Sequence, residues 1–270
     1  YAFLAYSKPM KKRAKLVPMS KSFDIPPEEG TNNIKEFFAD NINSLNAVGL
    51  LNAVKADETE INCTATVIKT NNGSIAITAA HCVYDHKLGA WNKVYFYPGY
   101  NNGAEGRVGK VVAYRSIIWN AFLENAEMYD YALTKFYYQN GRKLQDDTGA
   151  FDYDPDIPHG NYSITVFGYP ADGDMDCPRD GKHLCSFQGN SFDFPDNLPN
   201  ATSYRGIPID VGYGSSGGPW IRNYDPTTNT GTVIGISHGI LNEPYPETDT
   251  AACLWYHDEF LSMIKIAENN

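Results

Sequence analysis

The sequence lacks a long uninterrupted hydrophobic segment. Nowhere in its 270 residues is there a run of about 18 apolar residues, the length that a membrane-spanning helix requires. It also lacks an excess of positive charge, since 22 Lys and Arg stand against 32 Asp and Glu, which leaves a net charge of −10. Nucleic acid and anionic membranes attract basic proteins, so we predict neither as a partner.

Cysteine is sparse, and its spacing excludes a zinc ribbon. The five cysteines are Cys63, Cys82, Cys177, Cys185 and Cys253. They form no Cys-x-x-Cys pair, and we predict no metal and no cofactor. Two disulfides with one thiol left over suit an oxidising, extracellular compartment. Because the chain starts at Tyr1 rather than Met, we expect a processed or trimmed product from which any signal peptide has been removed.

No alternation of strands and helices indicates a parallel sheet. Short β-rich runs begin at residue 47 instead, separated by Asn, Gly, Asp and Pro. They are residues 47–53, 63–69, 74–79, 93–98, 107–114, 131–137, 163–168 and 231–238. Many short strands with turn signals between them are typical of an all-β barrel or sandwich.

The remaining segments divide the chain. Residues 1–45 are predicted to be an N-terminal extension, either a strap on the domain surface or a pro-segment with the basic cluster at 11–15 as its processing site. Apolar spacing within it predicts a short helix at 33–42. A polar break at 139–161 indicates a boundary between two β units, and the Pro-, Gly- and Asp-rich residues 170–208 predict a long loop region.

A helix is predicted from about Asp258 to the C-terminus. Phe260, Met263, Ile264 and Ala267 fall on one face of it at helical spacing, so this face is expected to pack on the domain.

A glycine-rich turn at residues 214–219, Gly-Ser-Ser-Gly-Gly-Pro, is the strongest chemical signal. Such a turn exposes a serine hydroxyl and lets backbone N–H groups converge on one point. Ser216 is the candidate nucleophile, and the N–H groups of Gly214 and Ser216 are the candidate oxyanion hole. By composition alone, such a stretch is more often an ordinary turn.

A serine nucleophile needs a base and a group that orients the base. His81 follows the β-rich run 75–80 and precedes Cys82, so a Cys63–Cys82 disulfide would hold together the hairpin behind the histidine. Asp130 heads an apolar strand, where a solvated acid is not expected. Taken singly, His81 could be a core histidine and Asp130 a cap at a strand start.

Taken together, residues 78–82 (Thr-Ala-Ala-His-Cys), 130–133 (Asp-Tyr-Ala-Leu) and 214–219 resemble the three signatures of the chymotrypsin-like serine peptidases. The order His, Asp, Ser is that of this family and differs from subtilisins and α/β-hydrolases. Within the family, the chain is most similar to the secreted bacterial and fungal branch that includes the glutamyl endopeptidases.

The resemblance implies an all-β fold of two six-stranded antiparallel Greek-key barrels with the active site between them. Residues 46–150 would form the first barrel with His81 and Asp130, and residues 151–270 the second barrel with Ser216 and the C-terminal helix. It implies a secreted, monomeric endopeptidase that hydrolyses protein or peptide substrates through an acyl-enzyme. A catalytically silent homologue that binds a partner in the same cleft is the alternative, and an esterase is disfavoured by the motif spacing and the chain order.

Two departures from the family pattern concern activation and disulfides. Ser215 stands where most animal members have Asp, which puts activation by a new N-terminal amine in doubt. The cysteine that often precedes the nucleophile is missing, so that Cys177–Cys185 is expected as a small local loop and Cys253 as a buried, inert thiol.

Specificity is open at this stage. The family places the base of the substrate pocket six residues before the nucleophile, at Asp210, which favours cleavage after Arg or Lys. The opposite wall contains Ser237, His238 and Gly239, and a histidine there resembles the glutamyl endopeptidases and favours acidic residues. If both line the pocket, Asp210 and His238 could pair with each other. The acidic cluster 172–176 departs from EF-hand spacing and is interpreted as a solvated loop.

Overall fold

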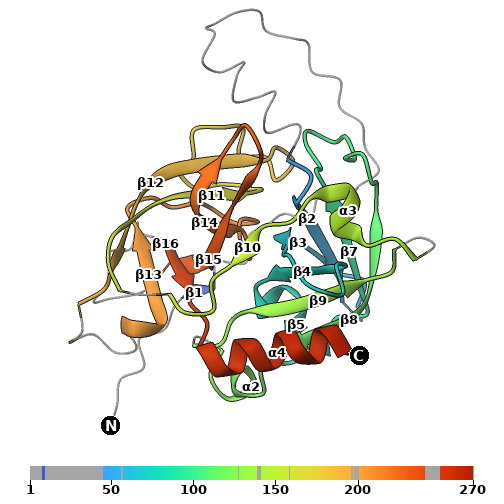
Figure 1. The fold of residues 1–270 in the computed structure, drawn as a ribbon, viewed down its shortest axis with the longest axis horizontal. Coiled ribbons are helices and arrows are strands. Elements are labelled where there is room, and N and C mark those ends of the chain that lie inside the picture. Colours follow the sequence, from blue (N-terminus) through green and yellow to red (C-terminus); the bar gives the residue numbers. More distant parts are fainter. Residues whose placement is uncertain are drawn as a thin grey trace, which may run out of the picture.

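The computed structural model describes residues 8–9 and 45–269, except 56, 127, 139–140, 158, 196, 198–200 and 241–249. The predicted helix at 33–42 and nearly all of the predicted N-terminal extension lie outside the described residues. Most described elements are strands, and they form two barrels that lie side by side (Figure 1). The prediction of an all-β fold with two six-stranded barrels and a C-terminal helix is confirmed.

The first barrel is closed and antiparallel. Its strands are β2 (Val48–Val54), β3 (Glu60–Val67), β4 (Ile75–Thr78), β7 (Lys93–Pro98), β8 (Val111–Ile118) and β9 (Ala132–Phe136). Their order around the barrel is β2-β3-β4-β9-β8-β7. Its connections contain the turn η1 (Ala80–Cys82), the hairpin β5 (Tyr84–Asp85) and β6 (Gly89–Ala90), and α2 (Ala121–Glu124). The helix α3 (Leu144–Thr148) follows its last strand, β9.

The second barrel repeats the same strand order. It contains β11 (Tyr162–Gly168), β12 (Cys185–Asp193), β13 (Tyr204–Ile207), β14 (Pro219–Asp225), β15 (Thr230–Ile240) and β16 (Thr250–Cys253). They run β11-β12-β13-β16-β15-β14, and β14 pairs with β11 to close the ring. The prediction that residues 170–208 form one long loop region is wrong, because β12, the turn η3 (Ala201–Ser203) and β13 lie within it.

Two short strands extend the second barrel. β10 (Asp152–Tyr153) pairs in parallel with the first half of β15. β1 (Lys8–Pro9) pairs antiparallel with its last residues, Lys8 opposite Ile240 and Pro9 opposite Gly239. Strand β15 therefore carries four neighbours along its length.

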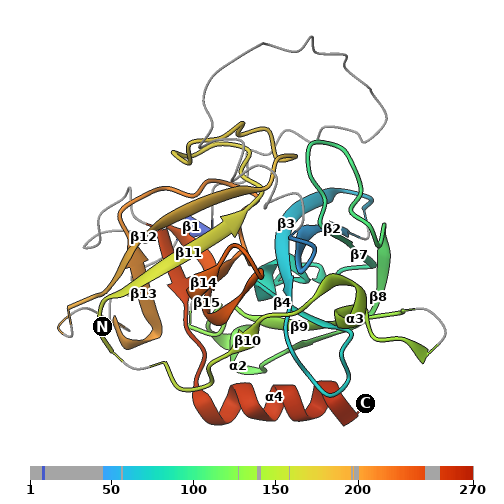
Figure 2. The same ribbon diagram turned by 45° about the horizontal axis from the view of Figure 1, so that its top comes forward.

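Helix α4 (His257–Asn269) ends the fold and buries the predicted face of Phe260, Met263, Ile264 and Ala267. It follows the second barrel in sequence but packs on β8 and β9 of the first, along the lower edge in both ribbon views (Figures 1 and 2). The ring of Phe260 stacks on Trp255 with centroids 4.5 Å apart and meets Tyr131 edge-on. The C-terminus thus ties the two barrels together.

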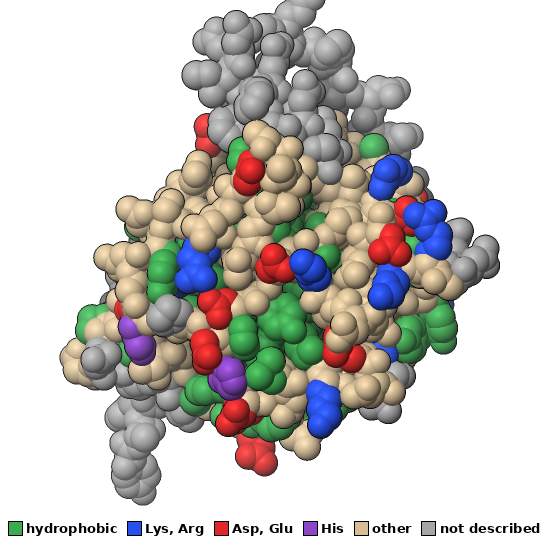
Figure 3. All heavy atoms as spheres, viewed as in Figure 1, with side chains coloured by type: hydrophobic (Ala, Val, Ile, Leu, Met, Phe, Trp, Pro, Cys, Tyr) green, Lys and Arg blue, Asp and Glu red, His purple; other side chains and the backbone are tan. Residues whose placement is uncertain are grey.

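The surface carries both acidic and basic side chains, as the composition leads us to expect. On the face of Figure 3, acidic and basic side chains are interspersed around a hydrophobic patch rather than gathered by sign. Among the described helices, none combines the length and the apolar character needed to span a membrane.

Candidate active site

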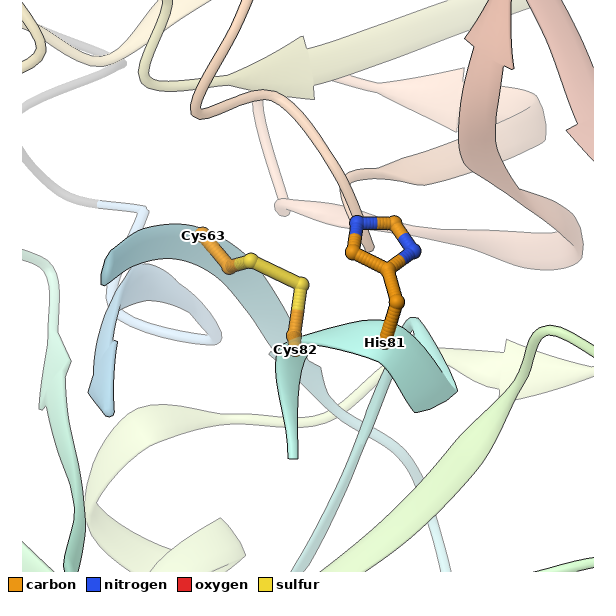
Figure 4. Close-up of side chains that lie close together, drawn as sticks. All are labelled: Cys63, His81 and Cys82. Carbon is orange, nitrogen blue, oxygen red and sulfur yellow. A yellow bond between two sulfur atoms is a disulfide. The ribbon is translucent and has the colours of Figure 1, made fainter. Parts of the chain in front are cut away.

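His81 lies in the η1 turn, directly after β4. The Cys63–Cys82 disulfide joins this turn to β3, with the imidazole of His81 projecting from the same turn (Figure 4). Small residues precede the histidine, so the chain turns tightly enough to bring the next residue, Cys82, within bonding distance of Cys63. The disulfide fixes the backbone on which the imidazole stands.

Asp130 is brought to His81 by the pairing of β4 with β9. Thr78, the last residue of β4, lies opposite Ala132, the first residue of β9, so both flanking segments leave the barrel at one end. Asp130 Oδ2 lies 2.6 Å from His81 Nδ1, and Oδ1 accepts a hydrogen bond of 2.8 Å from the His81 backbone N–H. The carboxylate is 1% exposed, whereas the imidazole is 27% exposed and reachable from outside.

The pair is electrostatically coupled. Burial lowers the pKa of His81, but the charge and the hydrogen bond of Asp130 outweigh burial and hold that pKa above 6.5. Burial also opposes ionisation of Asp130, but the charge of His81 and hydrogen bonds from His238 and His81 leave its pKa well below its usual value. The carboxylate is therefore ionised at neutral pH.

The glycine-rich turn seats the second barrel against the first. Gly217 has a positive φ of 78°, and a Cβ there would collide with the hydroxyl of Thr78 and the carbonyl of Thr64, both in the first barrel. Gly214 has a φ of 90°, and a Cβ there would collide with the Tyr169 carbonyl. Glycine is needed at both positions for conformation and for close approach.

Ser216 sits on the same turn, next to the histidine segment. Its carbonyl accepts a hydrogen bond of 2.8 Å from the Thr64 N–H, and the Cys82 Sγ lies 3.9 Å from that carbonyl. The residue is 4% exposed. Across the described part of the chain, no hydrogen bond joins the Ser216 hydroxyl to His81; such bonds are often long in unliganded enzymes and shorten when substrate binds.

Thr64 contributes to the candidate site through hydrogen bonds that the sequence did not reveal. Its hydroxyl donates to the Gly214 carbonyl at 2.9 Å and accepts from the Tyr169 N–H at 3.2 Å. It therefore pins the backbone beside the candidate oxyanion hole from the opposite barrel. Its only sequence signal is its position next to Cys63.

The surroundings of Ser215 indicate a structural role for this residue in the turn. Its buried hydroxyl donates to the Val211 carbonyl at 2.7 Å, within the same turn. Gly168 of β11 packs directly on Ser215, so a Cβ at residue 168 would collide with the Ser215 side chain. A serine here closes the turn on itself, without an ion pair to a chain terminus.

The four residues predicted to bind substrate have different surroundings. Asp210 is half-buried and accepts a hydrogen bond of 2.8 Å from the Gly212 N–H. Its pKa is raised, chiefly by burial and also by the charges of Asp172 and Asp174. His238 is buried and its Nδ1 lies 2.6 Å from Asp130 Oδ2, so the two candidates do not pair with each other.

The other two flank His238 on β15. The hydroxyl of Ser237 accepts a hydrogen bond of 3.0 Å from the buried Trp220 indole, so it faces the barrel interior. Gly239 lies opposite Pro9 of β1 on one side and Ala251 of β16 on the other.

The remaining cysteines are distributed as the sequence led us to expect. Cys177 and Cys185 are disulfide-bonded, and Cys253 is a free, buried thiol. Burial, followed by the charge of Asp130, raises the pKa of Cys253 well above its usual value, so it is not a thiolate at neutral pH.

Two groups of described residues have ligand atoms close enough to hold a metal ion. One is Cys63, His81 and Cys82, in which both cysteines are oxidised to a disulfide and cannot ligate as thiolates. The other is His81, Asp130 and His238, whose ligand atoms are already engaged in hydrogen bonds with one another. Neither arrangement favours metal chemistry over proton transfer.

Comparison with solved structures identifies the fold. A protease, Anisep, from Arthrobacter nicotinovorans superposes with a TM-score of 0.71 at 25% identity, over 84% of this chain and 97% of that one. A thermostable serine protease, AL20, from an extremophilic microorganism gives 0.71 at 22% identity, over 84% and 100%. A Glu endopeptidase gives 0.63 at 17% identity, over 84% and 92%. No protein-family profile and no curated protein sequence matches the chain. The chain has the fold of the chymotrypsin-like serine proteases.

Proposed function

We propose that the protein is a serine endopeptidase in which Ser216, His81 and Asp130 form the catalytic triad. In this mechanism, the Ser216 hydroxyl attacks a peptide carbonyl while His81 Nε2 takes its proton. Asp130 stabilises the imidazolium that results. His81 then protonates the leaving amine, and water hydrolyses the acyl-enzyme.

The oxyanion of the tetrahedral intermediate would be held by the N–H groups of Gly214 and Ser216. Both lie on the turn that Thr64 pins to the first barrel. One such donor is commonly worth about 3 kcal/mol of transition-state stabilisation.

The observation that carries this proposal is the buried, bonded His81–Asp130 pair beside a glycine-rich serine turn that docks on the same barrel. A fluorophosphonate probe tests it. We expect covalent labelling of the wild-type chain at Ser216 and no labelling of Ser216→Ala, with Ser215→Ala as the matched control that still reacts. A folded wild-type chain that stays unlabelled after removal of residues 1–45 would instead support the silent, partner-binding homologue.

For specificity, we propose a preference for acidic residues on the acyl side of the cleaved bond, with His238 as their ligand. Its Nδ1 is bonded to Asp130, so Nε2 is the atom that would meet a substrate carboxylate. The alternative is cleavage after Arg or Lys, which the three neighbouring carboxylates of Asp210, Asp172 and Asp174 would favour. A peptide-library cleavage profile decides between them, and Asp210→Asn should change the profile only in the second case.

We also propose that the enzyme is secreted and monomeric. The support for secretion is the pair of disulfides, which fit an oxidising compartment. Mass spectrometry of the alkylated protein from culture medium should find one free thiol, and sedimentation of the uncleaved chain should give a mass near 30.0 kDa.

Residues 1–45 are proposed to be a pro-segment. Lys8–Pro9 add to β15 at Gly239 and Ile240, beyond the point where β14 begins and next to the Ser216 turn. Cleavage at the basic cluster 11–15 would release this short strand from its tether and leave the edge of β15 to a substrate backbone.

A further inference from the structure

The carboxylate of Asp130 accepts hydrogen bonds from two imidazoles at one oxygen. Oδ2 lies 2.6 Å from Nδ1 of His81 and 2.6 Å from Nδ1 of His238. His238 is 4% exposed and Asp130 1% exposed, so this second contact is formed away from solvent. Breaking this contact would take a hydrogen bond from a buried carboxylate and from a buried imidazole, and both losses cost free energy.

The protonation pattern follows from the acceptor. An ionised carboxylate has no proton to give, so Nδ1 of both rings must carry one. Oδ1 is occupied by the His81 backbone N–H at 2.8 Å. Rotation of the carboxylate would therefore break bonds to His81 and to His238 at once.

His238 reaches Asp130 because β15 bulges at this residue. Ser237 lies opposite Ala252 and Gly239 opposite Ala251, so His238 is the extra residue on β15. A bulge re-aims the side chain of the extra residue. The His238 ring also lies against Tyr204 of β13, with centroids 5.6 Å apart.

The same stretch of β15 holds the nucleophile turn. The Ser237 carbonyl accepts the Gly217 N–H at 2.8 Å, and the Ser237 N–H donates to the Gly218 carbonyl at 2.8 Å. One short segment of the second barrel therefore contacts the serine turn through Ser237 and the carboxylate of the first barrel through His238.

We propose that His238 is a positioning residue for the reaction: it fixes the Asp130 carboxylate, and through it the His81 imidazole, relative to Ser216. This inference rests on the proposed peptidase function but not on the proposed preference for acidic residues. It acts through Asp130 and requires no contact between His238 and substrate.

Two substitutions separate this role from packing. His238→Asn loses the ring but keeps a side-chain N–H close to the position of Nδ1, whereas His238→Phe keeps a ring against Tyr204 and has no donor. For peptides without an acidic residue before the cleaved bond, we expect kcat to fall about 10- to 100-fold in His238→Phe, the equivalent of about 1.4–2.8 kcal/mol, with KM unchanged. His238→Asn should retain kcat within about threefold.

The fall in kcat must hold for every substrate. A fall in kcat of the same factor for peptides with acidic, basic and neutral residues before the cleaved bond supports positioning. A loss that is confined to acidic peptides and appears in KM overturns the inference and leaves His238 as a specificity residue. Equal losses in both variants also overturn it, because packing would then account for the effect.

A measurement on the unsubstituted enzyme covers the case in which the variants do not fold. Proton NMR of the full chain should show two low-field N–H resonances, one from each imidazole bonded to Asp130, and Asp130→Asn should shift both. A single resonance would overturn the inference. Fluorophosphonate labelling of the same sample tests the peptidase function separately: a labelled enzyme with one resonance refutes only the role of His238, and an unlabelled one removes the function on which it rests.

Discussion

Asp130 should determine how the catalytic activity of this protein depends on pH. Its charge and hydrogen bond hold the pKa of His81 above 6.5, so the base becomes neutral only above that pH. We expect kcat/KM to rise with pH through a midpoint above 6.5. Asp130→Asn should lower that midpoint and reduce kcat by about 10⁴-fold. A midpoint that does not move in this variant would contradict the coupling.

The same pair stabilises the fold in a different pH range. A raised pKa of His81 contributes stability below 6.5 that is lost as the pH rises through the folded-state value. A lowered pKa of Asp130 contributes stability above 3.8 that is lost as the pH falls through its folded-state value. Both contributions are complete between pH 3.8 and 6.5. Thermal melts should therefore show a larger loss for Asp130→Asn near pH 5 than near pH 9.

Thr64 offers a second test at the scale of single residues. Thr64→Val keeps the shape but removes the hydrogen-bond partner of the part-buried Gly214 carbonyl and of the buried Tyr169 N–H, so the free energy of unfolding should fall by about 1–3 kcal/mol. Thr66 is the matched control, because its buried hydroxyl already has no partner, and Thr66→Val should be neutral or stabilising. Equal losses in urea titrations of the two variants would refute the role of Thr64.

The site residues that lie in short local motifs could be predicted from the sequence. His81, Asp130 and Ser216 each occupy a recognisable short stretch, so their identities could be read without a structure. Contacts that join distant segments could not. The Thr64–Gly214 bond spans 150 residues and the His238–Asp130 bond spans 108, and both depend on how the barrels dock.

At the scale of elements, α4 should contribute stability to the barrel that it covers. Phe260 is fully buried against Trp255 and Tyr131, so Phe260→Ala should lower the free energy of unfolding by about 3–5 kcal/mol. Leu261, the next residue, is 37% exposed, and Leu261→Ala should cost less than about 0.5 kcal/mol. A comparable loss in both variants, measured by denaturant unfolding, would show that α4 is not docked through this face.

The strands of the first barrel were easier to predict than those of the second. β4 and β9 are short runs that are buried along their whole length, and β4 is apolar except for its last residue, Thr78. β12 reads Cys-Ser-Phe-Gln-Gly-Asn-Ser-Phe-Asp and buries only its first and seventh residues, so neither apolar content nor alternation marks it as a strand. β14 starts at Pro219, the last residue of the glycine-rich turn, and the glycines and proline of that turn obscure the start of the strand. Tertiary pairing, rather than propensity, makes these segments strands.

At the scale of the whole molecule, β15 is the strand on which both barrels and the N-terminal segment meet. Its middle joins β14 and β16, His238 reaches the first barrel, and its end carries β1. A few consecutive residues of β15 thus contact the serine turn, the buried carboxylate of Asp130 and the short strand β1. A segment added at the β15 edge that β1 occupies lies beside the proposed catalytic centre.

A reversible cross-link tests whether β1 blocks that edge. Directly opposed residues of antiparallel strands have Cα atoms about 4.5–5.5 Å apart, which a disulfide can bridge, so Lys8→Cys with Ile240→Cys should form one in the full chain. In the oxidised form, peptide hydrolysis should fall at least about tenfold, because a tethered strand competes at millimolar effective concentration or above. Mild reduction should restore the rate, whereas the single variant Ile240→Cys should not respond to oxidation.

The size of the probe then separates occlusion from damage. If β1 covers only the strand edge, a small fluorophosphonate should still label Ser216 in the oxidised variant while peptides are excluded. Loss of both reactions would mean that the cross-link distorts the serine turn, and equal peptide hydrolysis in both redox states would mean that substrates do not use the edge at Gly239 and Ile240. Only the selective loss of peptide hydrolysis supports a pro-segment that acts by adding a strand where the substrate would add one.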